Sequence, residues 1–376
     1  MRARDLGIEI GLGVPGPLNA ITDVAGVKVG CATLVSGAGP LVVGEGPVRT
    51  GVTVVVPRDG EISEQPLLAG CHRLNGNGEL TGLEWVRESG LLSSPIALTN
   101  SHSVGVVRDA LVKREIAARG PGKLFWSLPV VGETWDGCLN DVNGQHVRAE
   151  HLFAALAAAA GGPVPEGNVG GGTGMVCHDF KGGTGTSSRV VTAGGERFTV
   201  GVLVQANHGD RASFTVNGAP VGQVLDGEAV PLPTLPEEAP SAGAGSIIAI
   251  VATDAPLIPT QLQRLAQRAG LGVARLGAWA GNYSGDLFLA FSTANRGLPP
   301  MSYGSGGPLR VPLEMLSLCF IDPLFEAVVE ATAEAILNAM LQAETMAGRD
   351  GVTAHALDGA RLVEVLDRYG RRVFAG

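Results

Sequence analysis

Ser-Ile-Ile-Ala-Ile-Val-Ala-Thr-Asp, residues 246–254, is one of the most strand-like runs in the chain, with a continuous apolar stretch between polar ends. It directly follows Val-Pro-Leu-Pro-Thr-Leu-Pro-Glu-Glu-Ala-Pro-Ser-Ala-Gly-Ala-Gly, residues 230–245, which contains four prolines and no core-forming pattern. Ser246 therefore stands where a loop meets a buried strand. The loop is either a flexible linker between two domains or a place where the chain is cut, which would expose Ser246 as an N-terminal nucleophile.

Other apolar runs along the chain alternate with helical patterns. Apolar and β-branched residues predict strands at 51–57, 95–100, 128–134, 198–206 and 287–293. Apolar residues at three- and four-residue spacing predict helices at 79–91, 104–118, 150–160, 260–269 and 322–346. The fourth helix is expected to end at Gly270, and the fifth to start with Asp322 as its N-cap and Pro323 at its first position. This interleaving predicts mixed α/β layers rather than an all-β sandwich or a helical bundle.

The composition excludes several classes of protein. The chain has 376 residues, 45% of them hydrophobic and 17% charged, so it can bury a large core and is neither disordered nor fibrous. Its formal net charge of -9 argues against nucleic-acid and anionic-membrane partners. No apolar segment follows Met1, and the five scattered cysteines lack any CxxC pair, which predicts a cytoplasmic protein without an export signal.

Cofactor and metal motifs are weak. Gly11–Gly16 satisfies GxGxxG, but it lies too close to the N-terminus for a preceding strand, and Pro15 interrupts a helix start. The glycine-rich residues 170–185 include Lys181 without a GK[ST] ending, so they predict turns near a site. The seven histidines form no HxH or HExxH pair, and no GxSxG elbow occurs. We therefore expect no cofactor, no metal and no histidine-based triad.

Three polar clusters begin or end predicted strands, at residues 133–137, 205–209 and 282–286. Ordinary turn chemistry accounts for each cluster taken singly. Together with Gly245-Ser246 they supply a nucleophile, an amide donor, a hydroxyl and two carboxylates. That is the inventory of a hydrolase that works without histidine.

Short motifs in consistent order along nearly the whole chain resemble those of one known family. They are Asn19-Ala20-Ile21-Thr22-Asp23-Val24-Ala25-Gly26-Val27, Asn75-Gly76-Asn77-Gly78, Thr99-Asn100-Ser101, Leu139-Asn140-Asp141, Gln205-Ala206-Asn207, Gly245-Ser246 and Ser284-Gly285-Asp286. The chain resembles the L-aminopeptidase D-amidase/D-esterase family, which includes the β-aminopeptidases. The resemblance implies a four-layer αββα sandwich, similar to the N-terminal-nucleophile hydrolases but with different connectivity, and assembly into homo-oligomers such as a tetramer of processed α/β pairs.

The resemblance also implies that one catalytic domain, residues 1–376, cleaves itself between Gly245 and Ser246 into an α chain, 1–245, and a β chain, 246–376. Ser246 then matches the nucleophile. Its freed amine, with a reference pKa of about 7.7–8.0, could act as a base near neutral pH.

Other site residues are carried over by the same resemblance. Ser284 and Asp286 match a relay that orients the nucleophile and carries its proton. Asn207 matches an oxyanion donor, and Glu133 matches the carboxylate that holds the free amino group of the substrate. Two positions depart from the family: the β-aminopeptidases have Glu at the position of Asp286, which shortens the relay by a methylene, and Trp135 replaces a tyrosine that assists the oxyanion in some relatives.

The expected function is therefore a self-processing serine aminopeptidase or amidase that acts on short peptides, amides or esters with a free N-terminal amine. Two alternatives remain at this point. One is acyl transfer to an amine, as in the similarly folded ornithine acetyltransferases, which use a threonine nucleophile. The other is a non-catalytic oligomeric scaffold, for which the replacement of tyrosine by Trp135 is the best argument.

Overall fold

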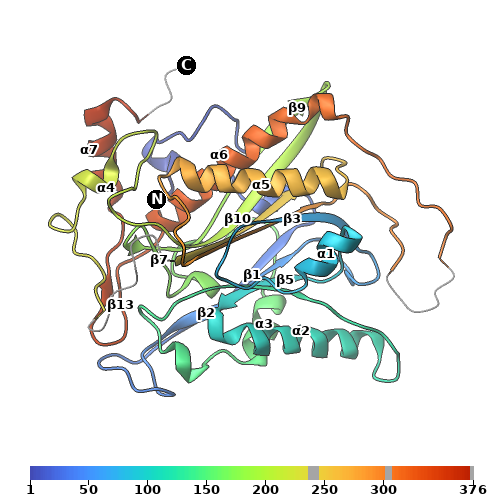
Figure 1. Ribbon diagram of the computed structural model, residues 1–376, viewed down its shortest axis with the longest axis horizontal. Helices are drawn as coiled ribbons and strands as arrows, with labels where there is room; N and C mark the ends of the chain where they lie inside the picture. The colour runs from blue at the N-terminus through green and yellow to red at the C-terminus, as the bar shows by residue number, and fades with distance from the viewer. Residues whose placement is uncertain (236–244, 301–306, 373–376) are drawn as a thin grey trace.

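Two β-sheets pack face to face, and each is covered on its outer face by helices (Figure 1). The structure is a computed structural model that describes residues 1–235, 245–300 and 307–372. From one side to the other, the layers are α5 with α6, a six-stranded sheet, a four-stranded sheet, and α2 with α3. The expected αββα sandwich is confirmed. Most of the expected linker, residues 236–244, lies outside the described residues.

The six-stranded sheet has the order β4-β3-β12-β11-β10-β9. Its strands β11 and β12 are parallel to each other, whereas β10 and β3 run antiparallel to them on either side. Both central strands are buried on two faces, which explains their nearly continuous apolar sequence. The bounds are β3 Leu67–Gly76, β4 Leu91–Leu92, β9 Gly183–Ala193, β10 Glu196–Asn207, β11 Gly245–Thr253 and β12 Ser284–Ser292.

The four-stranded sheet has the order β1-β2-β5-β6, with β5 and β6 parallel. Its strands are β1 Lys28–Ser36, β2 Val48–Val56, β5 Ile96–Asn100 and β6 Val130–Thr134. The covering helices are α2 Val104–Arg119, α3 Ala149–Ala157, α5 Pro259–Arg275 and α6 Asp322–Leu341. Smaller elements are α1 Leu83–Ser89, α4 Val221–Val224, α7 Gly359–Tyr369 and the hairpins β7 Val176–Cys177 with β8 Phe180–Lys181 and β13 Met346–Ala347 with β14 Thr353–Ala354.

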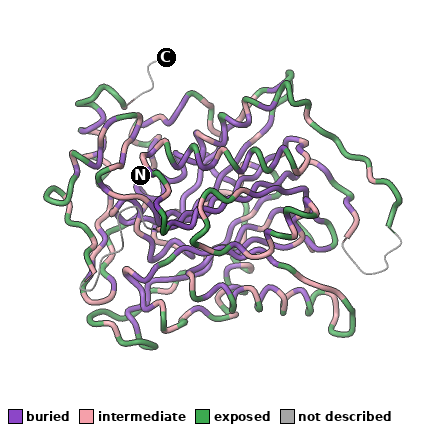
Figure 2. Tube along the Cα trace, in the orientation of Figure 1, coloured by how far each residue is buried: buried purple, intermediate pink, exposed green. Residues whose placement is uncertain are grey.

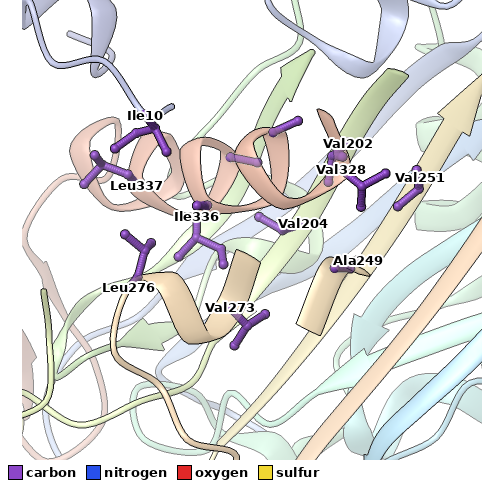
Figure 3. Close-up of a cluster of buried hydrophobic side chains, with 14 of the residues drawn as sticks. Ile10, Val202, Val204, Ala249, Val251, Val273, Leu276, Val328, Ile336 and Leu337 are labelled. Atoms are coloured by element: carbon purple, nitrogen blue, oxygen red, sulfur yellow. The ribbon is translucent and has the colours of Figure 1, made fainter. Parts of the chain in front are cut away.

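The hydrophobic core fills all three spaces between the layers. Figure 3 shows the space under α5 and α6, where Val204 of the sheet lies near Ile336 of α6 and Val251 lies near Val328 of the same helix. Helix α6 is buried around most of its surface (Figure 2), and its alanines let it approach β9 closely. A Cβ atom on Gly185 would lie only 2.1 Å from the carbonyl oxygen of Ala335, so that approach requires glycine.

Some expected boundaries are wrong. Helix α5 continues through Gly270 to Arg275, because its buried face continues with Val273. Asp322 lies within α6, and its side chain caps no backbone N–H. Strands β1, β3 and β9 and helix α7 were not expected, since β9 in particular buries glycine, serine and threonine instead of apolar residues. Within the described ranges, no helix combines the length and apolarity needed to cross a bilayer.

Candidate active site

Three strand ends of the six-stranded sheet bring the expected site residues together. In the antiparallel pair β10–β11, Asn207 is the Cα partner of Ser246. In the parallel pair β11–β12, Gly245 faces Ser284 and Ser246 faces Gly285. The end of β10 therefore meets the beginnings of β11 and β12, and segments far apart in sequence share one sheet edge.

The alternation of side chains divides these residues between the two faces of the sheet. Ile248 packs in the core between the sheets, whereas Ile247 packs under the helices. Ser246, two residues before Ile248, therefore faces the space between the sheets, and Asn207 shares that face as its cross-strand partner. By the same alternation, Asp286 faces the helices, because Phe288 of β12 packs there.

The amide of Asn207 is fixed by two backbone groups. Its Oδ1 accepts a 2.8 Å hydrogen bond from the Val176 N–H, and its Nδ2 donates one of 2.9 Å to the Trp135 carbonyl oxygen. This settles the orientation of the amide and leaves the second N–H on Nδ2 for another acceptor. Ser246 is only 3% exposed and Asn207 is also buried, so the Ser246 hydroxyl and the Asn207 amide lie in a largely desolvated site.

Ser284 and Asp286 form a buried pair on the helix side. Ser284 Oγ donates a 2.8 Å hydrogen bond to Asp286 Oδ1, so the shorter carboxylate reaches the hydroxyl directly. A register shift between β12 and β3 occurs at Asp286/Leu287. Burial raises the pKa of Asp286 to about 6, against the opposing effect of the Ser284 hydrogen bond. In the described part of the chain, its buried Oδ2 has no hydrogen-bond partner. The pair lines a small pocket shared with His208 and Trp279.

Glu133 is the penultimate residue of β6 on the opposing sheet and is 5% exposed. Its carboxylate accepts hydrogen bonds from the Ser101 hydroxyl and from the Glu79 N–H, the latter at 2.9 Å. Burial raises its pKa, and the two hydrogen bonds oppose that shift. Among the described residues, no Lys or Arg forms an ion pair with Glu133. A buried carboxylate without a cationic partner can receive the ammonium group of a ligand.

Trp135 and Gly245 contribute mainly through the backbone. The Trp135 carbonyl holds Asn207, while its side chain is 37% exposed and lies over Gly137. Gly245 has φ of +144°, and a Cβ atom there would lie 2.3 Å from the Asn207 carbonyl oxygen. The residue before Ser246 therefore has to be glycine.

Sequence reasoning missed two supports of the site. The Ser101 hydroxyl donates a hydrogen bond to the Glu133 carboxylate. From the sequence, Ser101 was identified only as part of the motif Thr99-Asn100-Ser101. Lys181 is fully buried, and its Nζ donates to the carbonyl oxygens of Met175 and Gly182, each at 2.8 Å, and of Gly172 at 3.4 Å. These three hydrogen bonds hold the turn that precedes Val176 in place. The glycine-rich segment holds site groups in place through such carbonyl contacts.

Residues 19–354 match peptidase family S58. The chain is 49% identical to beta-peptidyl aminopeptidase BapA of Sphingosinicella microcystinivorans, with 98% of this chain and 93% of the relative covered. The Burkholderia sp. beta-aminopeptidase structure superposes with a TM-score of 0.90 at 52% identity, covering 98% and 99% of the two chains. The L-aminopeptidase D-Ala-esterase/amidase of Ochrobactrum anthropi, described as a variant of the Ntn hydrolase fold, gives 0.88 at 43%, covering 99% of each.

The fold is thus that of an N-terminal-nucleophile-type hydrolase, and the site offers a buried serine with an oriented amide donor. The chain belongs to peptidase family S58 and is a serine aminopeptidase/amidase. Neither acyl transfer nor a scaffold role gains support from these relatives.

Proposed function

We propose that this aminopeptidase matures by cleaving itself between Gly245 and Ser246, and that Ser246 is then its nucleophile. The observation that carries the proposal is the pairing at the sheet edge. Asn207 lies opposite Ser246, and the relay hydroxyl of Ser284 lies opposite Gly245. The relay therefore lies beside the peptide nitrogen of Ser246, on the sheet face opposite to its hydroxyl.

The cleavage would follow from this arrangement in two steps. Ser246 Oγ attacks the Gly245 carbonyl carbon, the C–N bond breaks, and the acyl group moves from nitrogen to oxygen. Water then hydrolyses the ester, which leaves a carboxylate on Gly245 and a free amine on Ser246. That amine would face the Ser284–Asp286 pair, and this pair can orient it as the base that takes the Ser246 hydroxyl proton.

The same nucleophile would then act on substrates. It forms an acyl-enzyme, the free N–H of Asn207 stabilises the oxyanion, and water releases the N-terminal residue. Glu133 would bind the substrate's ammonium group and restrict the enzyme to short peptides, amides or esters with a free N-terminus. The support for this role is a buried carboxylate that accepts hydrogen bonds from the Ser101 hydroxyl and the Glu79 N–H and that forms no ion pair with Lys or Arg within the described ranges.

Assembly and location belong to the same proposal. We expect a cytoplasmic homo-oligomer, such as a tetramer of processed α/β pairs, without nucleic-acid or membrane partners. Exposed apolar side chains in the segment of chain that joins β12 to α6 support an assembly that would cover them. They are Leu309, Leu313, Met315, Leu318 and Phe320.

A gel and a substrate panel test the proposal. The purified protein should run as two chains of about 25 and 13 kDa, scaled from the 38.4 kDa chain. It should hydrolyse free-amine p-nitroanilides of L, D or β residues. An intact chain of 38.4 kDa that nevertheless hydrolyses them would show that Ser246 acts without self-cleavage.

A further inference from the structure

The thiol of Cys177 and the imidazoles of His178 and His208 lie close together next to the candidate active site. Cys177 ends β7, His178 begins the turn to β8, and His208 directly follows β10. All three residues are buried, and one ligand atom of each lies within 4.8 Å of the others. The residues come from two separate segments, so the spacing of histidines along the sequence could not indicate them.

The distances suit a small coordination centre. Cys177 Sγ lies 3.8 Å from His208 Nδ1. Metal–sulfur and metal–nitrogen bonds of about 2.3 and 2.0 Å, at trigonal or tetrahedral angles, place such atoms about 3.5–3.7 Å apart. The observed separation is therefore close to one edge of a metal site. The rings of His178 and His208 are 5.4 Å apart between centroids, and one ligand atom of each of the three residues lies within 4.8 Å of the others.

Two nitrogens of the cluster have no hydrogen-bond partner among the described residues. They are the buried Nε2 of His178 and the buried Nε2 of His208, whose Nδ1 lies near Cys177, although buried polar atoms usually have a partner. His178 Nδ1 lies 3.0 Å from the Asp210 carbonyl oxygen, so Nδ1 carries the proton and Nε2 presents a lone pair into the protein.

We propose that Cys177, His178 and His208 bind one thiophilic d10 cation, Zn²⁺ or Cu⁺. One thiolate and two imidazoles are a donor set that both ions accept, whereas Mg²⁺ and Ca²⁺ require oxygen ligands. On binding, the Cys177 thiol releases its proton to solvent as the sulfur–metal bond forms. A thiolate with Cu⁺ has no net charge, which reduces the cost of burying the complex. His208 also lines the small pocket that contains Ser284.

The position of the site gives it a role that is independent of self-cleavage. Val176, which holds the Asn207 amide, precedes Cys177, and Asn207 precedes His208. The cation would therefore tie together the two segments that orient Asn207. Occupancy should raise the melting temperature, because a ligand that binds only the folded state stabilises it.

Co²⁺ is a direct probe, because thiolate coordination gives a charge-transfer absorption that histidine alone does not produce. Purified protein treated with a chelator should bind one Co²⁺ per chain with this absorption, and Zn²⁺ should displace it. Separate titrations with Zn²⁺ and with Cu⁺ under reducing conditions, followed by the melting temperature, identify the preferred ion. Mg²⁺ should leave the melting temperature unchanged.

Matched variants locate the site. Cys177→Ala should abolish the absorption, whereas Cys71→Ala, which alters a buried cysteine in β3, should keep it. His178→Gln should weaken Co²⁺ binding at least tenfold. Circular dichroism shows whether each variant folds. If Cys177→Ala does not fold, His178→Gln tests the proposed site in its place. The proposal is overturned if folded native protein gives no absorption in excess Co²⁺ and neither Zn²⁺ nor Cu⁺ raises its melting temperature. It is also overturned if the absorption survives in Cys177→Ala or keeps its full affinity in His178→Gln.

Discussion

Ser284 is the Cα partner of Gly245 in the parallel pairing of β12 with β11, and its hydroxyl donates a hydrogen bond to Asp286. The pair thus lies beside the peptide bond that we expect to break. It is separated by the sheet from the Ser246 side chain. From this geometry we propose that Ser284 and Asp286 orient the nitrogen of residue 246, whereas Asn207 donates to the carbonyl that the Ser246 hydroxyl attacks.

Ser246→Ala should block both cleavage and activity, because alanine has no hydroxyl for the acyl shift or for the later acyl-enzyme. Ser246→Cys is the matched control, since a thiol retains a nucleophile and should still permit cleavage. Mass spectrometry of the purified variants gives the answer. Two chains broken at 245/246 in Ser246→Ala would show that an external protease cuts the chain.

Asn207→Ala should lower kcat by about 10²–10³-fold, the usual loss when one oxyanion donor is removed. The control is Asn217→Ala, which removes an amide that donates to the Glu9 and Arg371 carbonyl oxygens away from the site. Steady-state kinetics on a free-amine anilide measure both variants. If kcat/KM falls less than threefold in Asn207→Ala, Asn207 plays no part in stabilising the oxyanion.

Glu133→Gln should cost about 2–4 kcal/mol of transition-state binding for free-amine substrates, because a charge-assisted hydrogen bond becomes a neutral one. Glu326→Gln is the control, because it removes an exposed carboxylate on α6, on the outer face of the other sheet. N-acetylated anilides should be poor substrates for native enzyme and variant alike. Equal turnover of free and acetylated anilides by the native enzyme would contradict the anchoring role and indicate a general amidase.

Asp286 should make stability and processing depend on pH in opposite senses. Its pKa is raised from 3.8 to about 6 in the folded chain, so between these values the folded state binds more protons than the unfolded state. The protonated form therefore contributes stability that is complete below about pH 4 and lost as the pH rises through about 6. Processing, which needs the carboxylate as a hydrogen-bond acceptor, should instead become faster over that range.

Urea unfolding of the uncleaved Ser246→Ala protein measures its free energy of unfolding at each pH. Comparison with Ser246→Ala/Asp286→Asn should show a stability difference that changes between about pH 4 and 6 and is constant above it. Parallel pH profiles for the two proteins would mean that Asp286 does not titrate in this range. The processing rate of refolded wild-type chain, followed on gels, gives the second profile.

Much of the site could be predicted from the sequence, because local chemistry marks it. The apolar run after Ser246 indicates a strand buried on both faces, and amide and carboxyl groups at strand ends indicate a site edge. The ordered motifs then imply the family, which the comparisons confirm. Boundaries and strands that depend on burial rather than on an apolar pattern were missed. Strand β9 is an example, because the close approach of α6 favours its small residues.

The sequence by itself determined which residue types are present and which continuous apolar runs become buried strands, since propensity and apolar pattern act over a few neighbours. Only the tertiary structure decided which strands pair, and pairing places Gly245 beside Ser284 and Ser246 beside Asn207. It also decided which face each side chain takes, and it brought Cys177 and His178 to His208. These relationships join residues 30 to 40 positions apart, and they depend on sheet register and layer packing rather than on local sequence.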